Sequence, residues 1–259
     1  MKDWLEYLGK RVFLFAEYLG NLVVLWFQTS IYTFVPPFNR KRFFEQARRI
    51  GVDSLPIVSI VAIFTGMVLA LQTAYQMKKL SSEIYIANIV AVSLVRELGP
   101  VLTALIVAGR MGAAITAEIG TMSVTEQVDA LHTLAANPIK YLVVPRFLGL
   151  LIMLPLLTIY SDLVGIFGGY FICVSKIGIS SSIYLNMTFE SLALKDIFTG
   201  LIKAIFFGII IALVSCFSGL RTEGGAEGVG KATTSSVVTS FIFIITADCI
   251  FTALFYFIT

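Results

Sequence analysis

The chain has 259 residues, of which 58% are hydrophobic and 14% charged, and its formal net charge is +3. Soluble domains carry about 25% charged residues, so this composition excludes an ordinary soluble protein. Long uncharged runs separated by short charged segments are typical of a helical membrane protein, whereas barrel strands would alternate apolar and polar residues. The sequence therefore predicts an all-α integral membrane protein.

The first 50 residues form an N-terminal region that either crosses the membrane or lies on it. Residues 18–38 carry no charge and are long enough to span, but they include Asn21, Gln28 and Thr29. We favour an interfacial amphipathic helix, with its aromatic residues buried and its polar groups in water. Pro36-Pro37 ends this helix, and the basic segment 39–49 then lies against anionic headgroups.

Five later segments have about 20 apolar residues each, the length that crosses a bilayer. These predicted spans are residues 55–76, 84–109, 147–174, 197–219 and 236–257. Ten basic residues lie in the segment 39–49 before span one or in the loops after spans two and four, whereas four lie in the other loops. By the positive-inside rule, the N-terminus is on the cytoplasmic side and the C-terminus is outside. The sequence thus predicts two parts, an interfacial region over residues 1–50 and a five-span domain over residues 51–259.

The second predicted span carries adjacent charges, Arg96 and Glu97, near its middle. A charge inside the membrane costs about 2.5–3.5 kcal/mol, so such groups usually face a partner or a cavity. Gly99-Pro100 follows, and proline removes a helix hydrogen bond and kinks the helix. We predict a polar cavity at this depth. The alternative is an ion pair that only joins two helices.

Two more carboxylates lie deep in predicted spans, Asp162 in the third and Asp248 in the fifth. Either is a candidate partner for Arg96, or is simply protonated and hydrogen-bonded, since burial raises the pKa of a carboxyl group. Gln72 and Tyr75, late in span one, add polar groups towards the outer half. The chain shows no catalytic triad and no metal-ligand spacing, and its single histidine excludes a multi-histidine metal site. We predict neither a catalytic nor a metal site.

The connection between spans two and three is predicted to hold a cytoplasmic helix over about residues 124–136. Ser123 and Glu126 match a capping box at its start, and Asn137-Pro138 supplies a stop signal. The apolar residues that share one face at helical spacing are Val124, Val128, Leu131 and Ala135. The helix either packs on its own spans or docks into a cytoplasmic partner through its polar side, which carries Glu126, Gln127 and Asp129.

Residues 225–232, GAEGVGKA, come within one residue of the phosphate-binding loop G-x-x-x-x-G-K-[ST]. Such a loop follows a β-strand and ends in a hydroxyl for Mg²⁺. Here a predicted span precedes the stretch, and Ala232 replaces the hydroxyl. We interpret it as a glycine-rich connection that leads into the last span, with Thr233, Thr234 or Ser235 as the N-cap. Nucleotide binding by this chain is not expected.

Several of these segments resemble the MlaE permease family. The matching blocks are GMVLALQ in span one, LVRELGPVLTALIVAGRMGAAITAEIGTMSVTEQVDAL across span two and the next loop, PRFLGLLIMLPLLT at the start of span three, and GGAEGVGKATT before span five. The resemblance covers nearly the whole chain after residue 50. It implies an ABC transporter membrane subunit that moves phospholipids between the bacterial inner and outer membranes. Its implied fold is five spans behind an interfacial elbow helix, similar to type I ABC exporters of the G subfamily.

The same resemblance implies the partners. They are a second copy of the chain, two ATPase subunits that bind ATP and Mg²⁺ on the cytoplasmic side, and a periplasmic MCE-domain lipid-binding protein. The chain itself would bind no cofactor and no nucleic acid, and would lie in the bacterial inner membrane with its C-terminus in the periplasm. The helix at about 124–136 would be the coupling helix.

Candidate site residues follow from the residues and the resemblance together. The candidate lipid cavity comprises Gln72, Tyr75, Arg96, Glu97 and Asp248. The candidate ATPase-docking residues are Glu118, Glu126, Gln127, Asp129 and Leu131. Asp162 departs from the family pattern, in which we expect an apolar residue at that position.

Two other functions remain open from the sequence. A proton-coupled secondary transporter would use Glu97, Asp162 and Asp248 as a relay. It would be expected to contain inverted repeats, and the sequence shows no convincing repeat. A membrane anchor for a cytoplasmic complex would explain the docking helix but not the Arg-Glu pair inside span two.

Overall fold

The computed structural model describes residues 2–36, 39–80 and 82–258. The structure is 92% helical, and no strand occurs among the described residues. Within these residues, six helices are long and apolar enough to cross a membrane. The prediction of an all-α membrane protein is confirmed.

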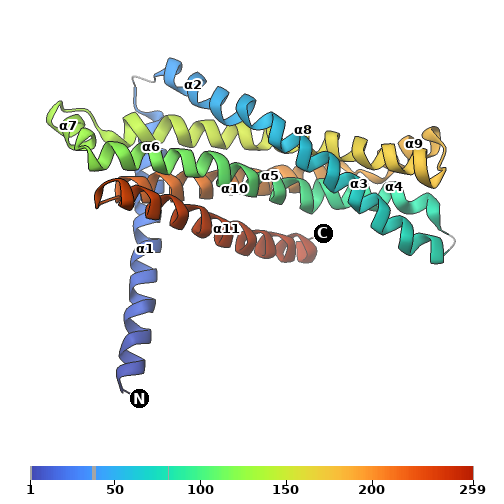
Figure 1. Ribbon diagram of the computed structural model, residues 1–259, viewed down its shortest axis with the longest axis horizontal. Coiled ribbons are helices and arrows are strands. Elements are labelled where there is room, and N and C mark those ends of the chain that lie inside the picture. The colour runs from blue at the N-terminus through green and yellow to red at the C-terminus, as the bar shows by residue number, and fades with distance from the viewer. Residues whose placement is uncertain (1, 37–38, 81, 259) are drawn as a thin grey trace.

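The helices follow one another with few breaks (Figure 1). In chain order they are α1 (Lys2–Phe34), α2 (Arg40–Gly51), η1 (Val52–Ser54), α3 (Leu55–Lys79), η2 (Glu83–Tyr85), α4 (Ile86–Ser93), η3 (Leu94–Leu98), α5 (Gly99–Val107), η4 (Ala108–Gly112), α6 (Ala113–Val124), α7 (Gln127–Thr133), η5 (Ile139–Val143), α8 (Val144–Ile172), η6 (Cys173–Ile177), α9 (Ser181–Ser191), α10 (Leu194–Leu220) and α11 (Gly225–Ile258). The five predicted spans lie within α3, the run from η2 to α6, the run from η5 to η6, α10 and α11.

The long helices other than α1 run along one axis and form a bundle (Figure 1). At its centre α8 packs against α2, α3 and α10, while α10 also packs against α6 and α11. Glycine lets α3 and α8 approach closely, because a Cβ at Gly66 would lie 1.9 Å from the Gly165 carbonyl oxygen. Small residues at such contacts are typical of packed membrane helices.

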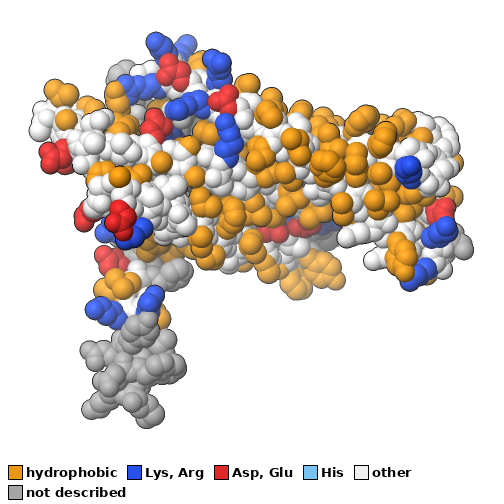
Figure 2. All heavy atoms as spheres, in the orientation of Figure 1, with side chains coloured by type: hydrophobic (Ala, Val, Ile, Leu, Met, Phe, Trp, Pro, Cys, Tyr) orange, Lys and Arg blue, Asp and Glu red, His pale blue; other side chains and the backbone are white. Residues whose placement is uncertain are grey.

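Apolar and charged side chains are separated along the bundle. Figure 2 shows charged groups gathered at the end that carries α7 and at the end that carries α9, with a mostly apolar belt between them. We call these the α7 end and the α9 end. An apolar belt bounded by charged ends fits a bilayer core with water on both sides.

Helix α1 lies crosswise to the bundle at the α7 end (Figure 1). Leu22 and Leu25 are buried in the main hydrophobic core, and the Tyr18 ring packs edge-to-face on Phe217 with the centroids 5.2 Å apart. Residues Gly9–Phe34 are apolar enough to cross a membrane. They would not cross it alongside the other helices in this orientation, so the arrangement favours an interfacial position for α1.

The second membrane helix contains two π-helical turns, η3 and η4. Pro100 has no N–H for the carbonyl of Arg96, and the Gly99 N–H bonds to the Leu94 carbonyl instead. The helix therefore accommodates Pro100 through a wider turn that contains Arg96 and Glu97, where the sequence predicted a kink. Such π turns are frequent at functional sites.

The predicted cytoplasmic helix is shorter than expected, because α6 continues to Val124 and α7 spans only Gln127–Thr133. The predicted capping box of Ser123 and Glu126 does not form. The Ser123 hydroxyl donates to the Leu220 carbonyl of α10 at 3.4 Å, and Glu126 adopts a left-handed backbone with φ of 60°. Asn137 acts on the following helix, since its Oδ1 accepts the Ile139 N–H at 2.9 Å.

The glycine-rich stretch is also not the connection that we predicted, because α11 already begins at Gly225. Thr233 and Thr234 lie inside the helix and donate to carbonyls four residues earlier, so they are not N-caps. The turn is made by Gly224 and Gly225, whose φ values are +84° and +67°. An ion pair of 2.7 Å between Glu227 and Lys231 supports the first turns.

Candidate functional site

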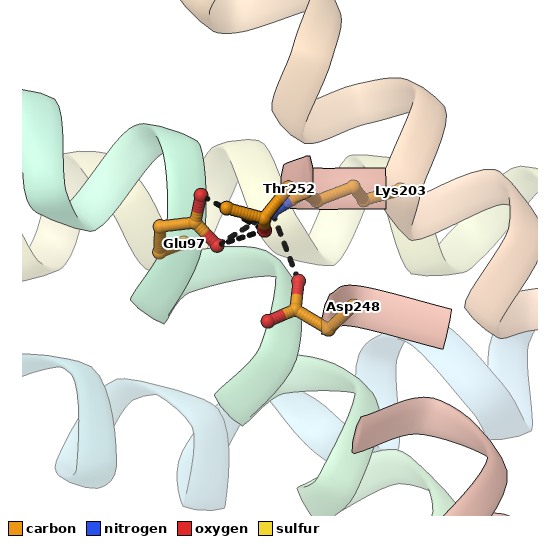
Figure 3. Close-up of polar contacts among 4 residues, drawn as sticks. All are labelled: Glu97, Lys203, Asp248 and Thr252. Carbon is orange, nitrogen blue, oxygen red and sulfur yellow. Dashed lines mark hydrogen bonds and ion pairs between the residues drawn. The ribbon is translucent and has the colours of Figure 1, made fainter. Parts of the chain in front are cut away.

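A fully buried lysine, Lys203 of α10, connects three helices inside the apolar belt (Figure 3). Its Nζ donates to Glu97 Oε2 at 2.5 Å and to Thr252 Oγ1 at 2.8 Å. It also lies 2.9 Å from Asp248 Oδ1, as an ion pair without hydrogen-bond geometry. We call Glu97, Lys203, Asp248 and Thr252 the Lys203 network.

The positions of these residues follow from helix geometry. Asp248 and Thr252 are four residues apart on α11 and therefore share one face. The Thr252 hydroxyl is also within 3.1 Å of Glu97 Oε2, so it is shared between the lysine and the carboxylate. Glu97 reaches the site from the π turn η3. The network thus joins η3, α10 and α11 through charged contacts.

A second ion pair lies on the same face of α10. Arg96 Nη1 is 3.5 Å from Asp196 Oδ1, and the other oxygen of Asp196 accepts the Ala193 N–H at the start of α10. Asp196 and Lys203 are seven residues apart, or about two helical turns. Arg96 and Glu97 are adjacent and point in different directions, as consecutive helix residues do, but each contacts a residue of α10.

The predicted partners of Arg96 are wrong. Arg96 pairs with Asp196, while Asp248 pairs with Lys203. Asp162 packs against the backbone at Gly99, where a Cβ would lie only 1.7 Å from Asp162 Oδ1. No hydrogen bond or ion pair among the described residues joins Asp162 to the Lys203 network.

The sequence reasoning missed Lys203, Asp196 and Thr252. A signal for Lys203 was present, because it is a single charge in the apolar run LIKAIFFGIII. Asp196 offered a weaker signal, since it lies seven residues before Lys203 and so on the same face of the helix. Threonine is common in membrane helices, and nothing in the sequence distinguishes Thr252 from the others.

The electrostatics of this region favour a partly open polar site. The two ion-pair groups contain two cations and three carboxylates, so one negative charge is in excess when all are ionised. Lys203 is completely buried, whereas 37% of the Glu97 side chain and 22% of the Asp248 side chain are exposed. Pairing offsets the cost of charges inside the membrane, while the Glu97 and Asp248 side chains stay partly exposed.

The network opens beside an apolar surface on α11. We define the α11 stripe by exposed residues at helical spacing, namely Val238, Ile242, Ile245, Cys249, Thr252 and Tyr256. Figure 2 shows acidic groups midway along the apolar belt. Charged groups that border an exposed apolar stripe would suit a ligand with a polar head and apolar chains.

Comparison with known proteins identifies the family. Residues 43–254 match the family model described as Permease MlaE. The chain belongs to the MlaE permease family. It is 46% identical over 248 residues to a probable ABC transporter permease protein of Rickettsia felis, with 96% of each chain covered. A probable ABC transporter permease protein of Synechocystis is 47% identical over 204 residues, with 79% of this chain and 78% of the relative covered. One from Porphyra purpurea is 40% identical over 239 residues, with 92% and 87% covered.

Family membership and these relatives support an ABC transporter permease subunit and a multi-pass membrane protein. Two candidate cavity residues of this MlaE-family chain lie apart from the Lys203 network. Gln72 and Tyr75 are exposed on α3, where the Lys79 ammonium lies 4.5 Å from the centroid of the Tyr75 ring. No hydrogen bond or ion pair given for the described residues joins them to the network, and α3 packs mainly on α8. Within one chain, the predicted cavity residues do not form a single site.

The candidate docking residues of the MlaE-family chain also separate. Glu126, Gln127 and Asp129 are exposed at and next to α7, and Leu131 is half-buried. Glu118 lies on α6, where its carboxylate is 3.4 Å from Arg49 of α2 and 3.1 Å from Arg146 of α8. Glu118 therefore ties three helices together at the α7 end, while the other four residues remain candidates for docking.

Proposed function

We propose that this chain is the permease subunit of an ABC transporter that moves phospholipids. The observation that carries the proposal is the Lys203 network beside the exposed α11 stripe. The charged groups would contact the polar headgroup, and the apolar stripe would contact the acyl chains. Family membership supports the transporter class, and the amphipathic site supports the lipid as substrate.

The site is proposed to be completed by a second copy of the chain. In one copy the α11 stripe is exposed, and Gln72 and Tyr75 lie exposed on a different helix. A homodimer with the two α11 stripes facing each other would enclose a lipid between apolar walls. The proposed location is the bacterial inner membrane, with α7 on the cytoplasmic side and the C-terminus towards a periplasmic MCE-domain protein that exchanges the lipid.

ATP and Mg²⁺ are proposed to bind two partner ATPase subunits on the α7 end. Closure of the ATPase pair would push on α7, which is joined to α6 by the turn at Glu126. Glu118 would pass this displacement to α2 and α8 through Arg49 and Arg146. The population of lipid-holding conformations would then shift with the nucleotide state of the partner.

The test is lipid transfer by the assembled complex in proteoliposomes, with a labelled phospholipid and ATP. We expect ATP-dependent transfer, and no ATP hydrolysis by the purified chain alone. Glu97→Gln removes one charged contact and should slow transfer about tenfold or more. The matched control is Glu190→Gln, an exposed carboxylate on α9, which should transfer lipid normally. ATP-independent transfer, or normal transfer by the Glu97 variant, would overturn the proposal.

A further inference from the structure

A pocket that lies apart from the Lys203 network is found at the α7 end. It has a volume of about 510 Å³ and is formed by the end of α1, the start of α2 and the start of the η5–α8 helix. Val35, Val144 and Pro145 give it an apolar wall, and Arg42 and Lys140 provide charges. A volume of this size is typical of sites for small organic ligands.

The charges in this pocket are all positive. Its described lining residues include no aspartate or glutamate, and neither Arg42 nor Lys140 takes part in an ion pair given for the described residues. The Arg42 guanidinium lies 3.3 Å from the centroid of the Tyr141 ring and donates to the Tyr141 hydroxyl. Lys140 Nζ donates to the Pro36 carbonyl at 2.9 Å. Both cations keep further N–H groups for an anion.

Two asparagines add hydrogen-bond donors to the same lining. Asn39 Oδ1 accepts the Arg42 N–H at 3.2 Å, and Asn137 Oδ1 accepts the Ile139 N–H at 2.9 Å. Because each side-chain oxygen already caps a helix, the amide NH₂ group of each is left as a donor. The pocket thus combines two full positive charges with neutral donors, the combination that binds phosphate.

The position of the pocket indicates where the anion comes from. An interfacial α1 would lie at the level of the membrane surface, and Tyr32 near its end and Val35 just after it line the pocket. Phe44 is an exposed aromatic residue on the basic helix α2, a combination that favours a position at the membrane surface. A ligand here would have its phosphate among cations and its chains against apolar groups.

We propose that this pocket binds the phosphate of an anionic phospholipid in the leaflet at the α7 end, as a lipid that stays bound and is not transported. Such a lipid would join α1, α2 and the start of α8 next to α7. The occupied pocket would hold the docking helix in place relative to the bundle.

The experiment uses the full-length chain in a non-ionic detergent, with phosphatidylglycerol added, and measures the melting temperature and the lipids retained in native mass spectrometry. The test variant is Arg42→Gln/Lys140→Gln. The matched control, Arg40→Gln/Lys41→Gln, removes the same charge from exposed residues of α2 outside the pocket. Phosphatidylcholine and inorganic phosphate serve as separate ligand arms.

We expect phosphatidylglycerol to raise the melting temperature of the wild type and the control equally. The test variant should need about a hundredfold more lipid, since each lost charged contact weakens binding about tenfold. If that variant does not fold, the two single substitutions are measured, each with an expected tenfold loss. Phosphatidylcholine and inorganic phosphate should give smaller shifts.

Three outcomes would overturn the proposal. The first is an equal response of the test variant and the control to phosphatidylglycerol. The second is a full shift with inorganic phosphate alone, which would make the ligand a free anion. The third is a full shift with phosphatidylcholine, which would show that the pocket does not select an anionic lipid.

Discussion

Lys203 is the residue through which the charged contacts between η3, α10 and α11 in its network are made. It is fully buried and forms ion pairs with both Glu97 and Asp248. Removing one member of a buried charge group leaves the others uncompensated, which typically costs about 3–5 kcal/mol. Carboxylates that face each other without a cation also repel.

We predict that Lys203→Met lowers the free energy of unfolding by about 3–5 kcal/mol. Adding Glu97→Gln to that variant should restore part of the loss, because one unpaired carboxylate is then removed. The measurement is thermal unfolding of the four proteins of this double-mutant cycle in detergent. Additive losses would show that Lys203 and Glu97 are not coupled.

At this scale the sequence predicted the charged residues better than their partners. Arg96 and Glu97 stood out because they interrupt an apolar run, and each forms an ion pair with a residue of α10. The predicted cavity stays a prediction. Their partners depend on which helices pack together, and one sequence does not reveal that α10 lies beside η3. The pairing of Arg96 with Asp196 therefore could not be derived, although Lys203 could have been noticed.

Among the elements, α7 is bounded by strained residues. Glu126 before it and Ala135 after it have φ values of 60° and 57°. A left-handed backbone costs roughly 1–2 kcal/mol for a residue with a Cβ. Keeping glutamate at such a position, where glycine would be easier, is consistent with a role for its side chain in docking.

We predict that Glu126→Gly raises stability by about 1 kcal/mol but reduces lipid transfer per ATP hydrolysed, because the exposed carboxylate is lost from the docking face. Ala135→Gly is the matched control, and should stabilise the chain similarly without loss of coupling. The measurements are thermal unfolding, and hydrolysis and transfer by the complex. Normal coupling in the Glu126 variant would remove this side chain from the docking role.

The contact between α3 and α8 gives a second test at the level of elements. Gly66→Ala would bring a methyl group to 1.9 Å from the Gly165 carbonyl oxygen, so the two helices would have to separate. We expect a loss of about 1–3 kcal/mol, read from thermal unfolding. Gly20→Ala on α1 is the control, because no atom lies within 4 Å of its added Cβ. It should be neutral or stabilising. Equal effects at both sites would contradict the close contact.

The boundaries of elements were predicted less well than their existence. All five predicted spans are helices in the structure, because a long apolar run can rarely form anything other than a membrane-spanning or buried helix. Glycine and threonine near residue 230 were taken as loop and cap residues, but the ion pair of Glu227 with Lys231 supports a helix there. The capping box failed because Ser123 bonds to another helix, a contact that local pattern rules do not contain.

For the whole molecule, the proposed dimer gives a test with a native residue. Cys249 is exposed in the α11 stripe, whereas Cys173 and Cys216 are buried. If the stripes of two copies face each other, a short apolar bismaleimide should link the chains in membranes through Cys249. We predict a dimer on denaturing gels that disappears with Cys249→Ser.

A control places the thiol elsewhere on the apolar belt. Phe167→Cys in the Cys249→Ser background puts an exposed cysteine on α8, which packs against α3 and α10. It should give no linked dimer. Linking of the α8 cysteine, with none through Cys249, would place the interface between copies on a different face.

The crosswise course of α1 has a consequence for the membrane itself. A helix of 33 residues is about 50 Å long, comparable to the thickness of a whole bilayer, yet lying flat it would displace lipid from one leaflet only. The chain would then have a wedge-shaped cross-section, wider in the leaflet at the α7 end. Its fit would depend on the curvature and lateral packing of the lipids around it, so its activity should vary with bilayer composition even when the transported lipid is kept constant.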